Sequence, residues 1–197
     1  MRSKWFGDNR DLVKWSVLIH LAKRFQSSVI LQVCFLSRHE FPQISLDGEL
    51  LPMPQEVVEH FRSIRSVERL SNDVKIKVFD LPLDDREAYL KGALDFVNKV
   101  SGQPRVVFLD PDTGLAPAKA GVTHVTELET RKFWAALASR DVLVLYQHQT
   151  NRNGALWVQP KREQFASAIG VGSEEVGIAK GESIARDVVF YYARKQT

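Results

Sequence analysis

The chain has 197 residues, of which 44% are hydrophobic and 26% charged, and its formal net charge at pH 7 is +3. This composition excludes a disordered, collagen-like or low-complexity chain. The small excess of Lys and Arg permits a nucleic-acid partner without requiring one. The length is near the upper end of what one compact domain holds, so residues 1–197 are predicted to form a single domain.

The first predicted element is a helix. Residues 12–22 carry apolar side chains at helical spacing, and Asp8 or Asn9 can cap the first free amides. The three-residue spacing of Asp8, Asp11 and Lys14 places these side chains roughly along one face of that helix. Two interpretations stay open: the three residues cap the helix and pair with one another, or Lys14 points into a cleft and meets an anion.

The rest of the chain alternates between short apolar runs, typical of buried strands, and amphipathic segments, typical of helices. The predicted strands are 29–36, 105–109, 141–146 and 187–192, together with 74–80, which alternates with period two as a strand with one solvated face does. The further predicted helices are 54–66, 84–100, 130–139 and 161–169. Residues 38–53, with two prolines and an Asp-Gly pair, are predicted to form a loop. This alternation predicts an α/β fold, a Rossmann-like three-layer sandwich with a mainly parallel sheet, whose final strand is a candidate for an antiparallel edge.

The sequence contains a single cysteine, which limits the disulfide and metal chemistry open to the protein. With Cys34 alone, an intramolecular disulfide and a Cys-based zinc cluster are excluded. Cys34 lies in an apolar run, where a thiol behaves as a small buried hydrophobe. No apolar run in the sequence approaches the roughly 18 residues of a membrane span, and the amino terminus does not resemble a secretion signal. We therefore expect a cytoplasmic protein without a membrane partner.

Two strand ends carry polar residues, and ligands of open α/β sheets bind beyond the carboxyl ends of the strands. The first is the sequence FLDPDTGL at residues 108–115, where a buried strand leads into Asp110 and Asp112. These carboxylates can accept protons or amino groups, or share a divalent cation. The alternative is a simple turn, because the residues of this segment favour turns.

The second strand end is the sequence LVLYQHQTNR at residues 143–152. Successive strands are often neighbours, so this segment is predicted to form a hydrogen-bonding shelf beside Asp110. His148 is a candidate general base, metal ligand or substrate donor, or else a loop histidine satisfied by the backbone. Glu127 and Glu129 begin a predicted helix, where capping explains them.

These motifs resemble those of known families. Residues 7–18, GDNRDLVKWSVL, resemble the opening G-N-x-x-D-x-x-K-H-x-x-L segment of the bacterial ribosomal-RNA adenine N6-methyltransferases of the J type, and LDPD at 109–112 stands where those enzymes have D-P-P-Y. The three-Cys-motif partner proteins, also methyltransferase-like, are similar in an early lysine-containing helix and a strand that ends in D-P. Most of the chain resembles bacterial proteins with F-G-D-x-x-D-x-x-K, F-L-D-P-D-N-G-L and Y-Q-H motifs, which bring no assigned activity.

The methyltransferase resemblance implies a Rossmann-like fold, an S-adenosylmethionine pocket, Lys14 near the cofactor and Asp110 holding the target amine. The chain differs from those enzymes at two places. Residues 37–40, Ser-Arg-His-Glu, stand where they have an acidic, Gly-rich loop that passes under the cofactor. Asp112 and Thr113 replace the Pro-Tyr pair whose ring stacks on the flipped base.

We therefore expect a methyltransferase-like protein that acts on or binds nucleic acid, with S-adenosylmethionine as its ligand and no assigned metal site. The residues assigned to it are Asp110, Asp112 and His148 for catalysis, Asp8, Lys14 and Gln147 for the cofactor, and Thr113, Gly114 and Arg152 for the substrate. The alternative is a nuclease or phosphoesterase that holds Mg²⁺ or Mn²⁺ on Asp110, Asp112 and His148, with Lys14 or Arg152 steadying a phosphate. A third class is a binding protein without catalytic activity.

Overall fold

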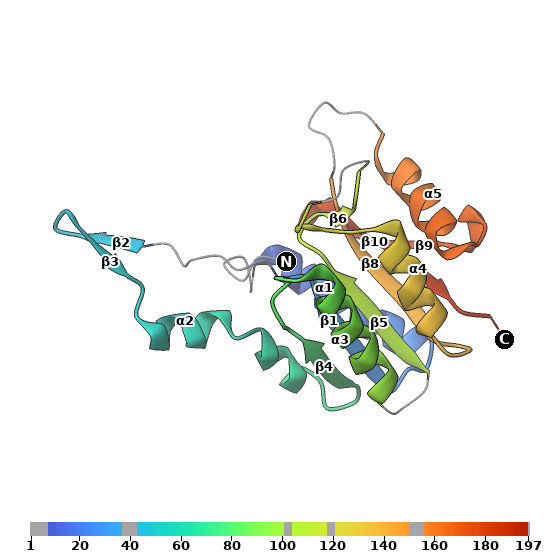
Figure 1. Ribbon diagram of the computed structural model, residues 1–197, viewed down its shortest axis with the longest axis horizontal. Coiled ribbons are helices and arrows are strands. Elements are labelled where there is room, and N and C mark those ends of the chain that lie inside the picture. The colour runs from blue at the N-terminus through green and yellow to red at the C-terminus, as the bar shows by residue number, and fades with distance from the viewer. Residues whose placement is uncertain (1–7, 37–42, 101–103, 118–120, 150–155, 197) are drawn as a thin grey trace.

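The computed structural model describes residues 8–36, 43–100, 104–117, 121–149 and 156–196, with the backbone alone for 60–62. Its centre is a six-stranded sheet in the order β4-β1-β5-β8-β10-β9 (Figure 1). The strands of this sheet are β1 (Val29–Cys34), β4 (Lys75–Phe79), β5 (Arg105–Asp110), β8 (Val142–His148), β9 (Gly177–Gly181) and β10 (Ala185–Arg194). The five predicted strands are thus confirmed, with small shifts at their ends.

The sheet is mainly parallel, as predicted. β1 pairs in parallel with β4 and β5, and β5 pairs in parallel with β8. β10 runs antiparallel to both β8 and β9, so the antiparallel pairing expected for the final strand is present at this edge. β9 occupies the edge itself and was not predicted, because its sequence GIAKG begins and ends with glycine and contains no apolar run.

Helices cover both faces of the sheet, which gives three layers (Figure 1). α1 (Asn9–Arg24) and a 3₁₀ helix (Ile64–Arg69) pack on one face, and α3 (Arg86–Lys99), α4 (Glu127–Ala136) and α5 (Val158–Ile169) pack on the other. Neighbouring residues of one strand serve opposite layers: Ile30 packs with the α1 side and Leu31 with the α3 side. Burial on both faces explains why β1, β5 and β8 are mainly apolar, whereas β4 at the edge alternates apolar residues with Lys75 and Lys77.

Two predicted helices have different bounds in the structure. The predicted helix 54–66 is divided into α2 (Gln55–Arg62) and the 3₁₀ helix, because Ser63 between them has extended backbone. α4 begins three residues before the predicted start, since Thr126 and Glu129 form a capping box. The Glu129 amide donates to Thr126 Oγ1 at 3.1 Å, and the Thr126 amide donates to Glu129 Oε2 at 2.8 Å. The capping role inferred for Glu129 is therefore confirmed.

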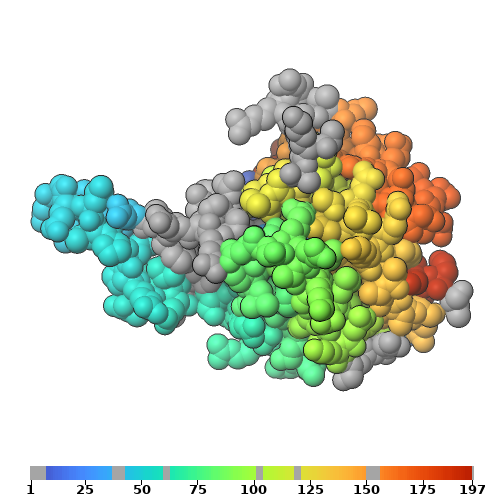
Figure 2. Space-filling model, in the orientation of Figure 1, coloured from blue at the N-terminus to red at the C-terminus, as the bar shows by residue number. Residues whose placement is uncertain are grey.

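The prediction of a loop over residues 38–53 is wrong for its described part. β2 (Gln43–Leu46) and β3 (Glu49–Pro52) form an antiparallel hairpin. Its two-residue turn consists of Asp47 and Gly48, both with positive φ, which suits the right-handed twist of a hairpin. Together with the start of α2, the hairpin projects from the body of the molecule (Figures 1 and 2). We call residues 43–59 the arm.

A smaller parallel pair, β6 (Gly114–Leu115) and β7 (His124–Val125), lies just beyond the end of β5. It fixes the course of the chain directly after the predicted Asp-Pro-Asp motif. In the parts of the chain that the structure describes, no helix combines the length and the apolar character needed to cross a membrane.

Candidate functional site

The carboxyl edge of the parallel strands contains a topological switch point. The chain leaves β1 toward β4 on one side, whereas β5 and β8 lie on the other side of β1. Ligands of open α/β sheets bind where the strand order reverses in this way. Asp110 is the last residue of β5 and is in register with Cys34 of β1, so it lies at this point. The ends of β5 and β8 are also neighbours, as predicted.

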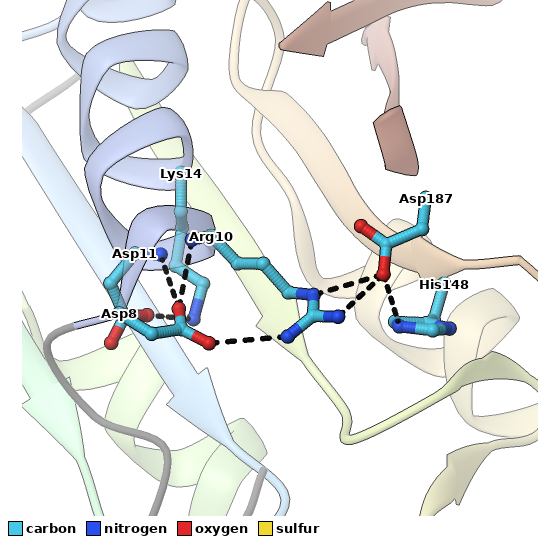
Figure 3. A network of polar contacts seen from close by, with 6 residues as sticks. All are labelled: Asp8, Arg10, Asp11, Lys14, His148 and Asp187. Carbon is cyan, nitrogen blue, oxygen red and sulfur yellow. Dashed lines mark hydrogen bonds and ion pairs between the residues drawn. The ribbon is translucent and has the colours of Figure 1, made fainter. Parts of the chain in front are cut away.

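A buried polar cluster surrounds Asp110, and we define it as Asp11, Lys14, Gln32 and Asp110. Asp110 is only 1% exposed, and its Oδ2 accepts hydrogen bonds from Lys14 Nζ at 3.0 Å and Gln32 Nε2 at 2.7 Å. Lys14 Nζ also donates to Asp11 Oδ1 at 2.7 Å (Figure 3). The pairing of Lys14 with Asp11 within α1 is confirmed, and Lys14 also pairs with the buried carboxylate of Asp110.

The cluster keeps Lys14 charged although it is buried. Burial alone would lower the pKa of Lys14, but the negative charges of Asp110 and Asp11 outweigh it and hold this pKa well above its ordinary value. The ring of Tyr146 lies 5.4 Å from Lys14 Nζ, within the range of a cation–π contact. Burial raises the pKa values of Tyr146 and of the buried thiol of Cys34, so both stay neutral at pH 7. With one ammonium and two carboxylates, the cluster has a formal charge of −1.

Gln32 joins the cluster as a residue that sequence reasoning missed. Its amide nitrogen is bound to Asp110, but its Oε1 is buried and has no hydrogen-bond partner among the described residues. An unpaired buried carbonyl oxygen costs about 1–3 kcal/mol. It is therefore an acceptor that suits an N–H or O–H donor from elsewhere. A signal was present in the sequence, because Gln32 is the one polar residue in the run VILQVCFL.

A second polar network joins α1 to the ends of β8 and β10 (Figure 3). Asp8, a predicted cofactor residue, caps α1 by accepting from the amides of Arg10 and Asp11 at 2.8 and 3.1 Å. Arg10 Nε donates to Asp187 Oδ2 at 3.2 Å, and the same oxygen lies 3.1 Å from His148 Nε2. Arg10 and Asp187 were missed because no apolar pattern or spacing marks them. The described contacts thus place His148 against Asp187 rather than against Asp110.

The Asp187 carboxylate gives this network a pH dependence. Burial would raise the pKa of Asp187, but the hydrogen bond and charge of Arg10 hold it below the ordinary value of 3.8. Its contribution to stability is therefore present above that value and is lost as the pH falls through the lower folded value. Because Asp187 is partly exposed, Asp187→Asn is expected to lower the free energy of unfolding by less than about 1 kcal/mol at neutral pH. Denaturation over a pH series should show this difference disappearing below about pH 4. A difference that grows in acid would contradict the assignment.

Gln147, the third residue predicted to bind a cofactor, is fully buried and holds β6 against β8. Its Nε2 donates to the Thr113 carbonyl at 3.0 Å, and its Oε1 accepts from the Leu115 amide at 2.9 Å. The Thr113 hydroxyl donates to the Thr123 carbonyl at 2.8 Å. The described bonds of Gln147 and Thr113 are therefore internal. Gly114 lies between the residues that Gln147 binds and has a φ of +118°.

Replacing Gly114 by alanine tests this packing. An L residue is strained at this φ, and a Cβ would overlap the amide group of Gln147, which cannot move because it is buried and bonded. We expect the free energy of unfolding to fall by about 3 kcal/mol, measured by urea denaturation. Gly170→Ala is the control, since Gly170 also has a positive φ but a Cβ there meets nothing within 4 Å. It should lose only about 1 kcal/mol. Equal losses would show that overlap with Gln147 is unimportant.

Two predicted site residues, Asp112 and Arg152, remain to be placed. Asp112 is partly buried just beyond β5, whereas Arg152 and residues 37–40 lie outside the described residues. Within the described ranges, no group of three or more His, Cys, Asp or Glu side chains is placed to hold a metal ion. The assignments of Asp112 to catalysis and of Arg152 to the substrate stay predictions.

Comparison with known proteins adds no family to this description. A scan against protein-family models finds no matching family, and a search of the curated proteins finds no match. The function is therefore inferred from the chemistry of the polar cluster, the fold and the motif resemblances.

Proposed function

We propose that the protein is methyltransferase-like, that it binds S-adenosylmethionine at the switch point between β1 and β5, and that it acts on or binds nucleic acid. The observation that carries this proposal is the ion pair of Lys14 with Asp110. Both side chains are at least 95% buried, and the pair lies where open α/β sheets bind ligands. Buried charges are expensive to desolvate and gather at functional sites.

The donor set fits this cofactor. S-adenosylmethionine carries a cationic sulfonium, a cationic amino group and one carboxylate, so its net charge is positive, and the polar cluster has a formal charge of −1. The unpaired Oε1 of Gln32 supplies an acceptor for an N–H or O–H group. A phosphate would instead meet the carboxylates of Asp11 and Asp110, which repel it. The charge of the cluster therefore favours a cationic ligand over the phosphate of a nuclease substrate.

The roles of the chain's own residues follow from their contacts. S-adenosylmethionine, when bound, supplies an activated methyl group. Asp110 already accepts from an ammonium and an amide group, the chemistry needed to hold an amino group of a base. Lys14 holds that carboxylate in place through their ion pair. The resemblance to the ribosomal-RNA adenine methyltransferases is what suggests nucleic acid as the substrate class.

Calorimetric titration of the full chain with S-adenosylmethionine tests the proposal. We expect one binding site, and we expect Asp110→Asn to weaken binding by about tenfold or more, because it removes the charge that complements the ligand. The control is Asp141→Asn, which weakens the buried ion pair with Arg105. This pair lies at the amino-terminal ends of β5 and β8, away from Asp110. The substitution should lower stability but leave the affinity of the folded protein unchanged. Absence of binding, or wild-type affinity in folded Asp110→Asn, would refute the assignment.

Asp112 separates this proposal from a metal-dependent nuclease. In the proposed site Asp112 lies in the target pocket, so Asp112→Asn is expected to change the affinity for S-adenosylmethionine by less than about twofold. A chelator should also leave this affinity unchanged. In a nuclease Asp112 would be a metal ligand, and the substitution keeps its shape while removing its charge. Phosphodiester cleavage that requires Mg²⁺ or Mn²⁺ and is lost in Asp112→Asn would favour the nuclease instead.

A further inference from the structure

The arm exposes apolar side chains in the described structure. Exposure reaches 42% for Ile44, 57% for Leu46, 65% for Leu50 and 43% for Val57. All residues of β2 and three of the four of β3 are exposed, although a hairpin normally buries one face. An isolated two-stranded hairpin is only marginally stable in water, and clustered exposed apolar residues mark contact surfaces. The arm therefore has the properties of a segment that a partner covers.

The charge of the arm is uniform in sign. Residues 43–59 contain Asp47, Glu49, Glu56 and Glu59 and no Lys or Arg, a formal charge of −4. These four side chains are exposed. A surface that covers the arm must therefore combine apolar contacts with positive charge.

A groove of this character lies between α1 and β9. It has a volume of about 550 Å³ and is lined by apolar residues that include Leu12, Val17, Ile178 and Ile184, with Arg24 and Lys180 as its cations. The described residues that line it include no Asp or Glu. Lys180 lies 3.9 Å from the exposed Glu182, and such a surface pair contributes little. The groove is thus apolar and basic where the arm is apolar and acidic.

We propose that the arm of one copy of the chain docks in the groove of a second copy. The arm leads through α2 and the 3₁₀ helix to β4, at one edge of the sheet, whereas the groove lies against β9 at the other edge. The arm projects away from the body on the side opposite β9 (Figure 1), so in this conformation it lies away from the groove of its own chain. If a two-fold axis relates the two copies, the arm of each copy lies in the groove of the other.

Charge reversal with light scattering tests this docking. The wild-type chain is expected to self-associate as its concentration rises. The arm variant Glu49→Lys/Glu56→Lys/Glu59→Lys, whose arm has a formal charge of +2, and the groove variant Arg24→Glu/Lys180→Glu should each associate about tenfold more weakly, because each places like charges opposite one another. All five positions are exposed and lie outside the positive-φ turn of the arm, so the variants should fold. The control Lys91→Glu/Lys132→Glu makes the same charge change as the groove variant on exposed positions of α3 and α4, and it should associate as the wild type does.

Mixing the two variants gives the sharper result. In such a mixture, the basic arm of the arm variant can dock in the acidic groove of the groove variant. The unchanged acidic arm of the groove variant can dock in the unchanged basic groove of the arm variant. An equimolar mixture is therefore expected to restore association to within about threefold of the wild type. A wild-type chain that stays monomeric at every concentration would overturn the proposal. Association unaffected by either reversal, or a mixture that stays monomeric, would also overturn it.

Discussion

Lys14→Met is expected to lower the free energy of unfolding by about 3–5 kcal/mol, because it removes the ammonium that pairs with two buried carboxylates. Lys14 is 4% exposed, and its Nζ lies 2.7 Å from Asp11 Oδ1 and 3.0 Å from Asp110 Oδ2. Methionine keeps much of the apolar stem, so the loss reports the charge rather than a cavity. Urea denaturation followed by circular dichroism measures it.

The pH dependence of this loss has a definite sign. The folded pKa of Lys14 is raised above its ordinary value of 10.5, so its contribution is fully present below that value and is lost only as the pH rises through the higher folded value. Between about pH 6 and pH 9 Lys14 stays charged in both the folded and the unfolded chain. Its titration should therefore not change the difference in unfolding free energy between wild type and Lys14→Met over this range.

Two further variants identify the cause of the loss. Lys23→Met changes an exposed lysine of the same helix and should alter stability by less than about 0.5 kcal/mol. Adding Asp110→Asn to Lys14→Met should recover part of the loss, since the neutral amide needs no cation. If Lys14→Met were as stable as Lys23→Met, the ammonium would not be compensating the buried carboxylates.

Arg105→Met is also expected to lower the free energy of unfolding by about 3–5 kcal/mol. Arg105 lies at the amino-terminal end of β5, whereas Asp110 lies at its carboxyl end. Nε and Nη2 of Arg105 donate to Asp141 Oδ2 at 3.0 and 2.6 Å, and its Nη1 donates to the Val97 carbonyl at 2.6 Å. Asp141 is fully buried, so removal of the guanidinium leaves a carboxylate in the core. Urea denaturation should show the loss, while the affinity of the folded protein for S-adenosylmethionine should be unchanged.

Burial decides the size of this effect, and a second arginine shows it. Arg65 makes a two-pronged ion pair with Asp80 at 2.8 and 2.7 Å, but its side chain is 60% exposed. Arg65→Met is therefore expected to cost less than about 1 kcal/mol. Equal losses for Arg65→Met and Arg105→Met would show that desolvation of the remaining carboxylate is not the source of the effect.

β1, β5 and β8 could be predicted because burial on both faces makes each of them a mainly apolar run. β4 could be predicted because its sequence KIKVF alternates with period two. The same reasoning placed Asp110 at a strand end, and helical spacing placed Lys14 beside Asp11. The contact between Lys14 and Asp110 could not be predicted, since 96 residues separate them and the strand order that joins them is a tertiary property. The hairpin of the arm was missed because Asp-Gly marks loops and two-residue turns alike.

The two sides of α1 face different surroundings only a few residues apart. Lys14 lies on its inner side against Asp110, and Leu12 and Val17 line the groove on its outer side. A shift or rotation of this helix would change both surroundings at once. If the proposed ligand and the proposed second copy each favour one position of the helix, binding of each affects the other by the same factor. Under such coupling, the apparent affinity for S-adenosylmethionine would vary with the concentration of the protein itself.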